Sequence, residues 1–200
     1  MSNQLASAPS YPAFVRSLFQ VSGDPSKDFA HAIMGVVTET YEYLRAKDRT
    51  HAIEELGDAD FYVQATKQVL EDFIVDRLPM SDIEAQVEDE LRVFISLTPD
   101  GRKEMLDSTL NELLDHAKRW VGYGTAPLSI PAAFSLVLVA QIAGREQGLV
   151  PLSDASVSRI RSVNMAKLAK RFPAGKYEQF RALQRDLAGE RETLEAAVLG

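Results

Sequence analysis

Apolar residues recur at intervals of three and four along most of this chain, and the strict alternation typical of a half-buried strand is scarce. Prolines, glycines and short polar segments divide this pattern into successive stretches that we predict to be amphipathic helices. The predicted helices span about 11–21, 26–47, 51–77, 81–97, 102–121, 131–148 and 153–171, with a charged final helix that ends near 198. Candidate N-terminal caps are Ser26 or Asp28, Thr50, Ser81, and Ser153 or Asp154.

The short connections between these helices favour antiparallel neighbours, so the predicted fold class is an all-α antiparallel helix bundle. Residues 1–10 are polar and small and are predicted to be a flexible tail, whereas residues 11–200 are predicted to form a single all-α domain. The most apolar stretch, 130–143, is too short to span a bilayer and is predicted to be a buried helix. Trp120 and Phe61 are expected in the core, with stacking on a nucleotide base as the alternative.

Four acidic residues are the strongest candidates for chemistry. Glu39 and Glu42 are three residues apart on one predicted helix, and Glu55 and Asp58 are three apart on the next. Residues at this spacing lie about 60° apart around a helix and about 4.5 Å apart along it, so each pair shares a face. If the helices are antiparallel, the four carboxylates converge and repel one another unless a cation neutralises them. Oxygen ligands of high charge suit Mg²⁺, with Mn²⁺ as an alternative.

The composition removes several other kinds of chemistry. The chain has 200 residues and no cysteine, which excludes disulfides, thiolate nucleophiles and cysteine-ligated zinc. Its three histidines form no HExxH motif, which argues against a catalytic zinc site. The net charge of −7 argues against nucleic acid as a partner, and the N-terminus does not resemble a secretory signal. We therefore expect a soluble cytoplasmic protein without a membrane or nucleic-acid partner.

Three blocks of the sequence carry a family resemblance. Residues 34–42 read Met-Gly-Val-Val-Thr-Glu-Thr-Tyr-Glu, residues 54–58 read Glu-Glu-Leu-Gly-Asp before Phe61 and Tyr62, and residues 164–173 contain Asn-Met-Ala-Lys-Leu and Arg-Phe-Pro. In this order, the blocks resemble the Gly-x-x-x-Glu-x-x-Glu, Glu-Glu-Leu-Gly-Asp and Asn-x-x-Lys-Leu-x-x-Arg-Tyr-Pro motifs of the MazG-like nucleotide pyrophosphohydrolases, which belong to the all-α NTP pyrophosphatases. The segment 182–195 is similar to the end of the phage-type members.

The resemblance implies an enzyme that uses Mg²⁺ to hydrolyse nucleoside triphosphates to a monophosphate and pyrophosphate. The implied metal ligands are Glu39, Glu42, Glu55 and Asp58. Either Glu42 or Glu55 is a candidate to orient or deprotonate the attacking water. The implied substrate contacts are Asn164, Lys167 and Arg171, with Lys118 and Tyr123 as further candidates.

The chain also departs from the family pattern. Family members place a lysine-rich helix end and a Tyr-Gly-Lys turn between the two acidic motifs, whereas a similar element, 118–124, appears here much later. We interpret 28–76 and 154–198 as the core, with extra helices over 80–148 that replace a second subunit, and we expect a homodimer. Glu112 and Asp115 repeat the acidic spacing, which is compatible with a decayed internal repeat or with two unrelated amphipathic helix pairs.

Other interpretations of the same residues remain open. Lys167 and Arg171 are equally compatible with an exposed charged face, and Asn164 with a solvent-facing helix position. Glu54 and Asp60 point elsewhere around their helix and are expected at the surface or beside the ligands. The function itself has two alternatives, which are a non-catalytic helical module with a decayed enzyme fold and a hydrolase of another nucleotide pyrophosphate such as an alarmone.

Overall fold

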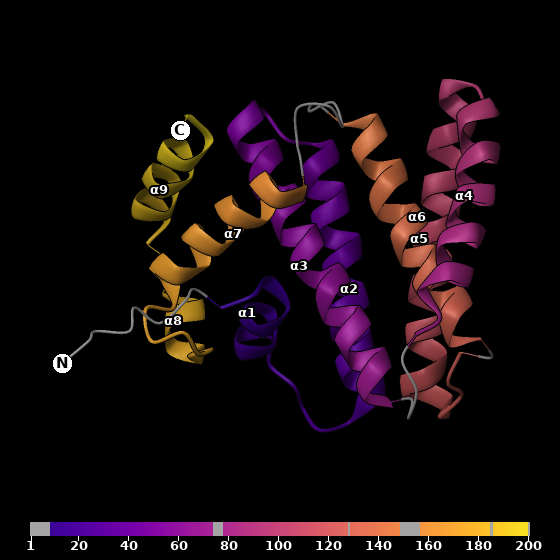
Figure 1. The fold of residues 1–200 in the computed structure, drawn as a ribbon, viewed down its shortest axis with the longest axis horizontal. Coiled ribbons are helices and arrows are strands. Elements are labelled where there is room, and N and C mark those ends of the chain that lie inside the picture. The colour runs from indigo at the N-terminus through magenta and orange to yellow at the C-terminus, as the bar shows by residue number, and fades with distance from the viewer. Residues whose placement is uncertain (1–8, 74–77, 128, 149–156, 185, 200) are drawn as a thin grey trace.

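The structure is a computed structural model that describes residues 9–73, 78–127, 129–148, 157–184 and 186–199 (Figure 1). The described residues are helical and contain no strand, which confirms the all-α prediction. The helices are α1 (Tyr11–Leu18), α2 (Pro25–Leu44), α3 (Arg49–Phe73), α4 (Met80–Ser96), α5 (Pro99–Tyr123), α6 (Ile130–Gln147), α7 (Val157–Arg171), α8 (Gln179–Leu183) and α9 (Leu187–Leu199).

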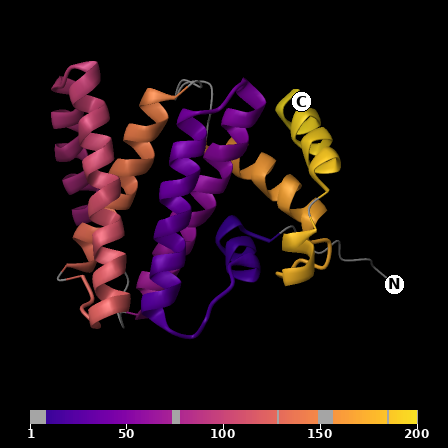
Figure 2. The same ribbon diagram turned by 180° about the vertical axis from the view of Figure 1, so that it is seen from behind.

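The long helices α2 and α3 form the centre of the molecule and pack against each other along their length. Helices α4, α5 and α6 cover one side of this pair, and α1, α7 and α9 lie on the other side, as both views show (Figures 1 and 2). The α2–α3 pair therefore has one face closed by the extra helices and one face turned toward α1 and α7. The candidate site lies on the second of these faces.

Two glycines allow the central helices to approach their neighbours. A Cβ atom on Gly35 of α2 would lie 2.2 Å from the ring of Tyr62 on α3. A Cβ atom on Gly57 of α3 would lie 2.9 Å from the Cβ atom of Asn164 on α7. Because carbon atoms in contact are normally about 3.5–4.0 Å apart, only glycine fits at either position without a shift of the neighbouring group.

The apolar helix α6 is buried, as the sequence predicts. Phe134, Val137 and Ala140 are almost fully enclosed where α6 packs against α2, α3, α4 and α5. Trp120 also lies in the core, where its ring contacts Phe29 and Phe73. Of the helices that the structure describes, none combines the length and apolar content needed to cross a membrane.

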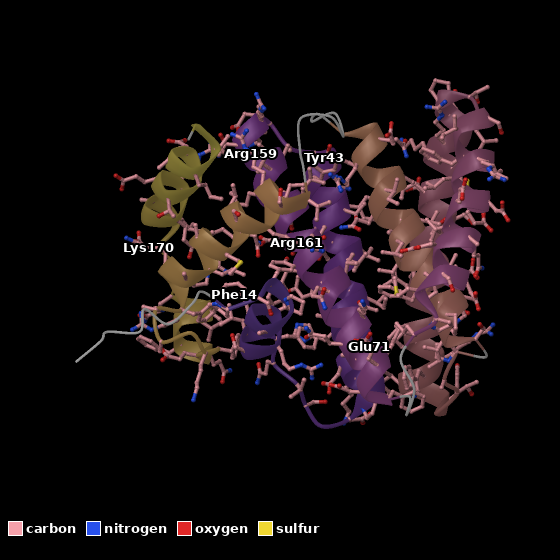
Figure 3. All side chains as sticks on the ribbon, viewed as in Figure 1. Phe14, Tyr43, Glu71, Arg159, Arg161 and Lys170 are labelled. Carbon is pink, nitrogen blue, oxygen red and sulfur yellow. The ribbon has the colours of Figure 1, made fainter. Side chains whose placement is uncertain are left out.

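A buried ion pair fixes α7 to the central helices. Asp60 on α3 is 5% exposed and accepts a hydrogen bond of 2.7 Å from Arg161 on α7. Its other oxygen accepts a bond of 3.1 Å from Gln141 on α6. Figure 3 labels Arg161, which lies beside the central helices. A surface position for Asp60 is therefore wrong, because this carboxylate joins three helices inside the bundle.

Several predicted helix ends differ from the structure. Asp24, rather than Ser26 or Asp28, caps α2, because its carboxylate accepts a hydrogen bond from the Ser26 amide. Asp48, rather than Thr50, accepts a bond from the amide of His51 at the start of α3. The break predicted between the helices over 81–97 and 102–121 is instead the capped first turn of α5, and the single predicted final helix is two helices, α8 and α9. The candidate caps at 153 and 154 and the end predicted at 77 lie outside the described residues.

Candidate functional site

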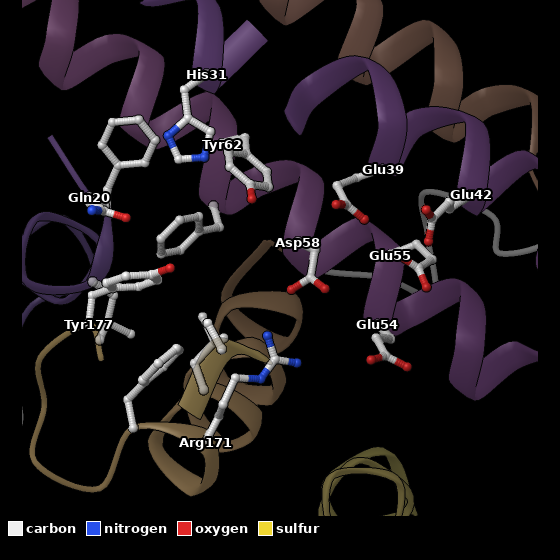
Figure 4. A pocket seen from close by; sticks show the side chains of 16 residues that line it. Gln20, His31, Glu39, Glu42, Glu54, Glu55, Asp58, Tyr62, Arg171 and Tyr177 are labelled. Carbon is white, nitrogen blue, oxygen red and sulfur yellow. The ribbon is translucent and has the colours of Figure 1, made fainter. Parts of the chain in front are cut away.

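Four predicted metal ligands line one pocket between the central helices and α7. Glu39 and Glu42 project from α2, and Glu55 and Asp58 project from α3, toward the same space (Figure 4). The pocket has a volume of about 440 Å³, within the range of roughly 300–1,000 Å³ typical of small-molecule sites. The four carboxylates therefore share one cavity, as their helical spacing predicts.

Three of the acids are close enough to share one ion. Ligand oxygens of Glu39, Glu42 and Glu55 lie within 4.8 Å of one another. Glu55 is 6% exposed and Glu42 is exposed, so the three carboxylates extend from the interior to the mouth of the pocket. This set offers only hard oxygen donors, which fits Mg²⁺ or Mn²⁺ better than a softer metal.

The raised pKa values of two of these acids also indicate that a bound cation would stabilise the group. Burial, followed by the negative charge of Asp58 and contact with Glu55, raises the pKa of Glu39 to about 9. Burial also raises the pKa of Glu55 above its ordinary value. A carboxyl that is hard to ionise because of its neighbours becomes easy to ionise when a cation joins the group. The protein therefore holds carboxylates where their charge is unfavourable without a bound cation.

Asp58 has a different set of partners from the three glutamates. Its Oδ1 atom accepts a hydrogen bond of 2.6 Å from Asn164, and its Oδ2 atom accepts one from Lys167. Lys167 also lies 3.3 Å from Glu54, and its side chain is completely buried. Burial alone would lower the pKa of Lys167, but the charges of Asp58 and Glu54 outweigh it and raise that pKa.

This arrangement decides between the predictions for α7. Lys167 and Asn164 are both buried, so a solvent-exposed face is wrong for these two residues. Arg171 is 15% exposed, lines the pocket and forms a bidentate pair with Glu190 at 2.9 and 2.6 Å. That pair uses Nε and Nη2 of the guanidinium, which leaves the donors of Nη1 for a ligand. Substrate binding by these side chains remains a prediction.

The two further candidates lie elsewhere. Lys118 and Tyr123 are on α5, and neither belongs to the described residues that line the pocket. The side chain of Lys118 is 68% exposed and pairs with Asp115 at 3.1 Å, and Tyr123 is 74% exposed. The structure does not bring them to the acids, so their role as substrate contacts stays an untested prediction.

The other end of the pocket is lined by aromatic side chains, which the sequence did not assign to the site. They are Phe19, His31, Phe61, Tyr62, Phe172 and Tyr177. Phe19 stacks on His31 with ring centroids 4.8 Å apart, and Phe172 lies 5.6 Å from Tyr177. Gln20 adds an exposed amide to this wall. Phe61, Tyr62 and Phe172 stand within or beside the recognised motifs, but nothing local marks Phe19, Gln20 or Tyr177.

Comparisons with known proteins give no relative for this chain. Neither a scan against protein-family models nor searches of curated proteins and solved structures found a match. The pocket between α2, α3 and α7 is therefore the structural observation that bears on function. Its acidic end fits a divalent cation, and its aromatic end fits a planar ring. Arg171 also lines the pocket and carries a positive charge.

Proposed function

We propose that this protein is a Mg²⁺-dependent nucleoside triphosphate pyrophosphohydrolase that releases a nucleoside monophosphate and pyrophosphate. One observation carries the proposal, namely that a single pocket joins a cluster of carboxylates to an aromatic wall. A nucleotide has the matching parts, because its phosphates bind through a divalent cation and its base has flat apolar faces. The resemblance to the MazG-like enzymes supports the same reaction.

Each group in the acidic end has a role in this proposal. Glu39, Glu42 and Glu55 would hold Mg²⁺, whose positive charge would polarise a phosphoryl oxygen. A water molecule attacks the α-phosphorus, the bond from that phosphorus to the bridging oxygen breaks, and pyrophosphate leaves. Glu42 is the exposed carboxylate of the three, so it is the better placed of the two candidate bases to accept the proton of a water that enters from solvent.

The remaining residues position the substrate. Arg171 donates from Nη1 to a phosphate oxygen while Glu190 holds the rest of its guanidinium. The base lies against the aromatic wall, where Tyr177 and Tyr62 offer ring faces or edges and Gln20 offers a donor and an acceptor. Asp58 stays fixed by Asn164 and Lys167 beside the ion site.

A panel of nucleotides tests the proposal directly. The pure protein is incubated with each nucleoside triphosphate and Mg²⁺, and pyrophosphate is measured. We expect release from at least one nucleotide, loss of release with EDTA, and a fall of at least about 100-fold in Glu39→Gln, because a charged ligand that stabilises the transition state contributes several kcal/mol. Glu112→Gln is the matched control, since Glu112 has the same spacing to a second acid but is exposed on α5.

The outcomes separate the alternative functions. Release of pyrophosphate by Glu39→Gln at the rate of the unmodified protein would refute the proposed site. Hydrolysis of an alarmone or a nucleotide-linked metabolite alone would favour the other nucleotide pyrophosphatase. Nucleotide binding without any turnover, measured by calorimetry with and without Mg²⁺, would favour the non-catalytic module.

A further inference from the structure

Lys167 is a fully buried cation at the edge of the acidic cluster. It reaches from α7 to α3, where its ammonium group contacts Asp58 and lies 3.3 Å from Glu54. Lysine is almost never completely buried without a charged partner, because removal of the ammonium from water is expensive. The two carboxylates therefore explain why Lys167 can occupy this position, and Lys167 in turn neutralises part of the acidic end.

The carboxylates of the pocket consequently divide into two groups. Asp58 and Glu54 share the ammonium of Lys167. Among the described residues, no lysine or arginine forms an ion pair with Glu39, Glu42 or Glu55, and the one basic partner is His51, which lies 2.9 Å from Glu55. The first group is balanced by a covalently attached cation, whereas the second group, apart from the contact of Glu55 with His51, has no lysine or arginine partner among the described residues.

The division into two groups limits the number of divalent ions that the pocket can bind. Phosphoryl-transfer sites with two metal ions hold them about 3.5–4 Å apart, with neighbouring carboxylates divided between them. Here the position between Asp58 and Glu54, beside the three glutamates, is filled by an ammonium group, which is a compact point charge with three donors. Both oxygens of Asp58 are also already hydrogen-bonded, one to Asn164 and one to Lys167.

We propose that Lys167 is a fixed counter-cation that takes the place of a second divalent ion, so that the pocket binds one Mg²⁺ per chain. This inference rests on the proposed ion site of Glu39, Glu42 and Glu55, and it adds the number of ions and the reason for it. Lys167 is a positioning residue in this scheme, because it fixes Asp58 and limits the charge that the pocket can attract. Replacement of Lys167 by a neutral residue leaves Asp58 and Glu54 as a second cation site.

Mn²⁺ is the probe for the test, since free Mn²⁺ can be counted by its paramagnetic resonance signal. The full-length protein is titrated with Mn²⁺ alone, without nucleotide. We expect one ion per chain for the unmodified protein and two per chain for Lys167→Gln, which keeps a donor near Asp58 but removes the charge. Lys170→Ala is the matched control on the same helix, where the side chain is exposed and outside this pocket, and it should still bind one ion.

Each outcome bears on a different claim. Two ions of similar affinity in the unmodified protein would overturn the role of Lys167 while leaving the proposed reaction intact, and this result needs no folded variant. One ion in both the unmodified protein and a Lys167→Gln variant with unchanged helical circular dichroism would also overturn it. No Mn²⁺ binding by the unmodified protein would instead remove the ion site on which the proposed function depends.

Discussion

Substitution of Gly57 by alanine tests how closely α3 and α7 must approach. The new Cβ atom would lie 2.9 Å from the Cβ atom of Asn164, which is fixed directly to the α7 backbone and cannot rotate away. Because carbon atoms in contact are separated by at least about 3.5 Å, α7 must move by about 0.6 Å or the side chains must strain. Overpacking of this kind typically costs about 1–3 kcal/mol.

Helix propensity acts in the opposite direction. Alanine is better than glycine inside a helix by about 1 kcal/mol, so the net loss of stability for Gly57→Ala is expected between about 0 and 2 kcal/mol. Gly122→Ala on α5 isolates the propensity term, because an added Cβ there meets no atom within 4 Å. We expect this control to be more stable than the unmodified protein by up to about 1 kcal/mol. The difference between the two variants measures the packing term.

Chemical denaturation followed by circular dichroism gives both free energies of unfolding. A difference of about 1–3 kcal/mol is expected, which corresponds to roughly 2–4 °C in Tm per kcal/mol for a chain of this size. Gly57→Ala should also release pyrophosphate more slowly than its stability explains, because a shift of α7 moves Asn164 and Lys167 away from Asp58. If Gly57→Ala gains as much stability as Gly122→Ala, the contact between α3 and α7 is looser than we infer.

Three further predictions concern binding of the nucleotide base, the dependence of Tm on pH, and the ion pair of Arg171. Tyr177→Ala should raise KM for nucleoside triphosphates by roughly 5- to 150-fold, because one stacking contact is worth about 1–3 kcal/mol. KM for inorganic tripolyphosphate should not change, and an equal rise for both substrates would contradict base binding. Folding raises the pKa of Glu39 from 4.5 to about 9. Between these pH values the folded state without metal therefore binds more protons than the unfolded state, so Tm in EDTA should fall as pH rises from 5 to 9. The fall should be smaller in Glu39→Gln, and a Tm that rises with pH would refute the assignment. Arg171→Ala removes two charge-assisted hydrogen bonds to Glu190 and should lower the free energy of unfolding by about 1.5–3 kcal/mol. Chemical denaturation of Arg171→Ala, Glu190→Gln and the double variant checks this, because the double variant should lose less stability than the sum of the single losses, and strictly additive losses would contradict the pair.

The sequence predicts the helices and the acidic face because both are local properties. Spacing of three and four residues places Glu39 with Glu42 and Glu55 with Asp58 whatever the rest of the chain does. The aromatic wall is different, since Phe19 comes from the end of α1 and Tyr177 from the segment after α7. Those residues meet only when helices far apart in sequence pack together, so no pattern along the chain marks them.

The burial of Lys167 likewise could not be predicted from the sequence. A lysine on a charged helix normally faces solvent, and its spacing to Arg171 fits an exposed face as well as a phosphate site. The structural cause is the approach of α7 to α3 at Gly57, which brings Lys167 against Asp58 and Glu54. A motif can therefore indicate residues that the fold brings together and still not show which of them contact one another inside the bundle.

A comparison of two acidic pairs, Glu39 with Glu42 and Glu112 with Asp115, shows what converts a common pattern into a candidate site. Glu112 and Asp115 have the same spacing as Glu39 and Glu42, yet on α5 Glu112 is exposed and Asp115 is partly exposed, and they pair with His116, Lys118 and Arg119. Cationic neighbours and water already stabilise these carboxylates, so they gain little from a bound ion. Glu39 has burial and other carboxylates around it instead, and its raised pKa records that disadvantage. A bound cation is thus expected to stabilise this pocket most beside Glu39, because that carboxylate is buried among other carboxylates and, among the described residues, forms no ion pair with a lysine or arginine.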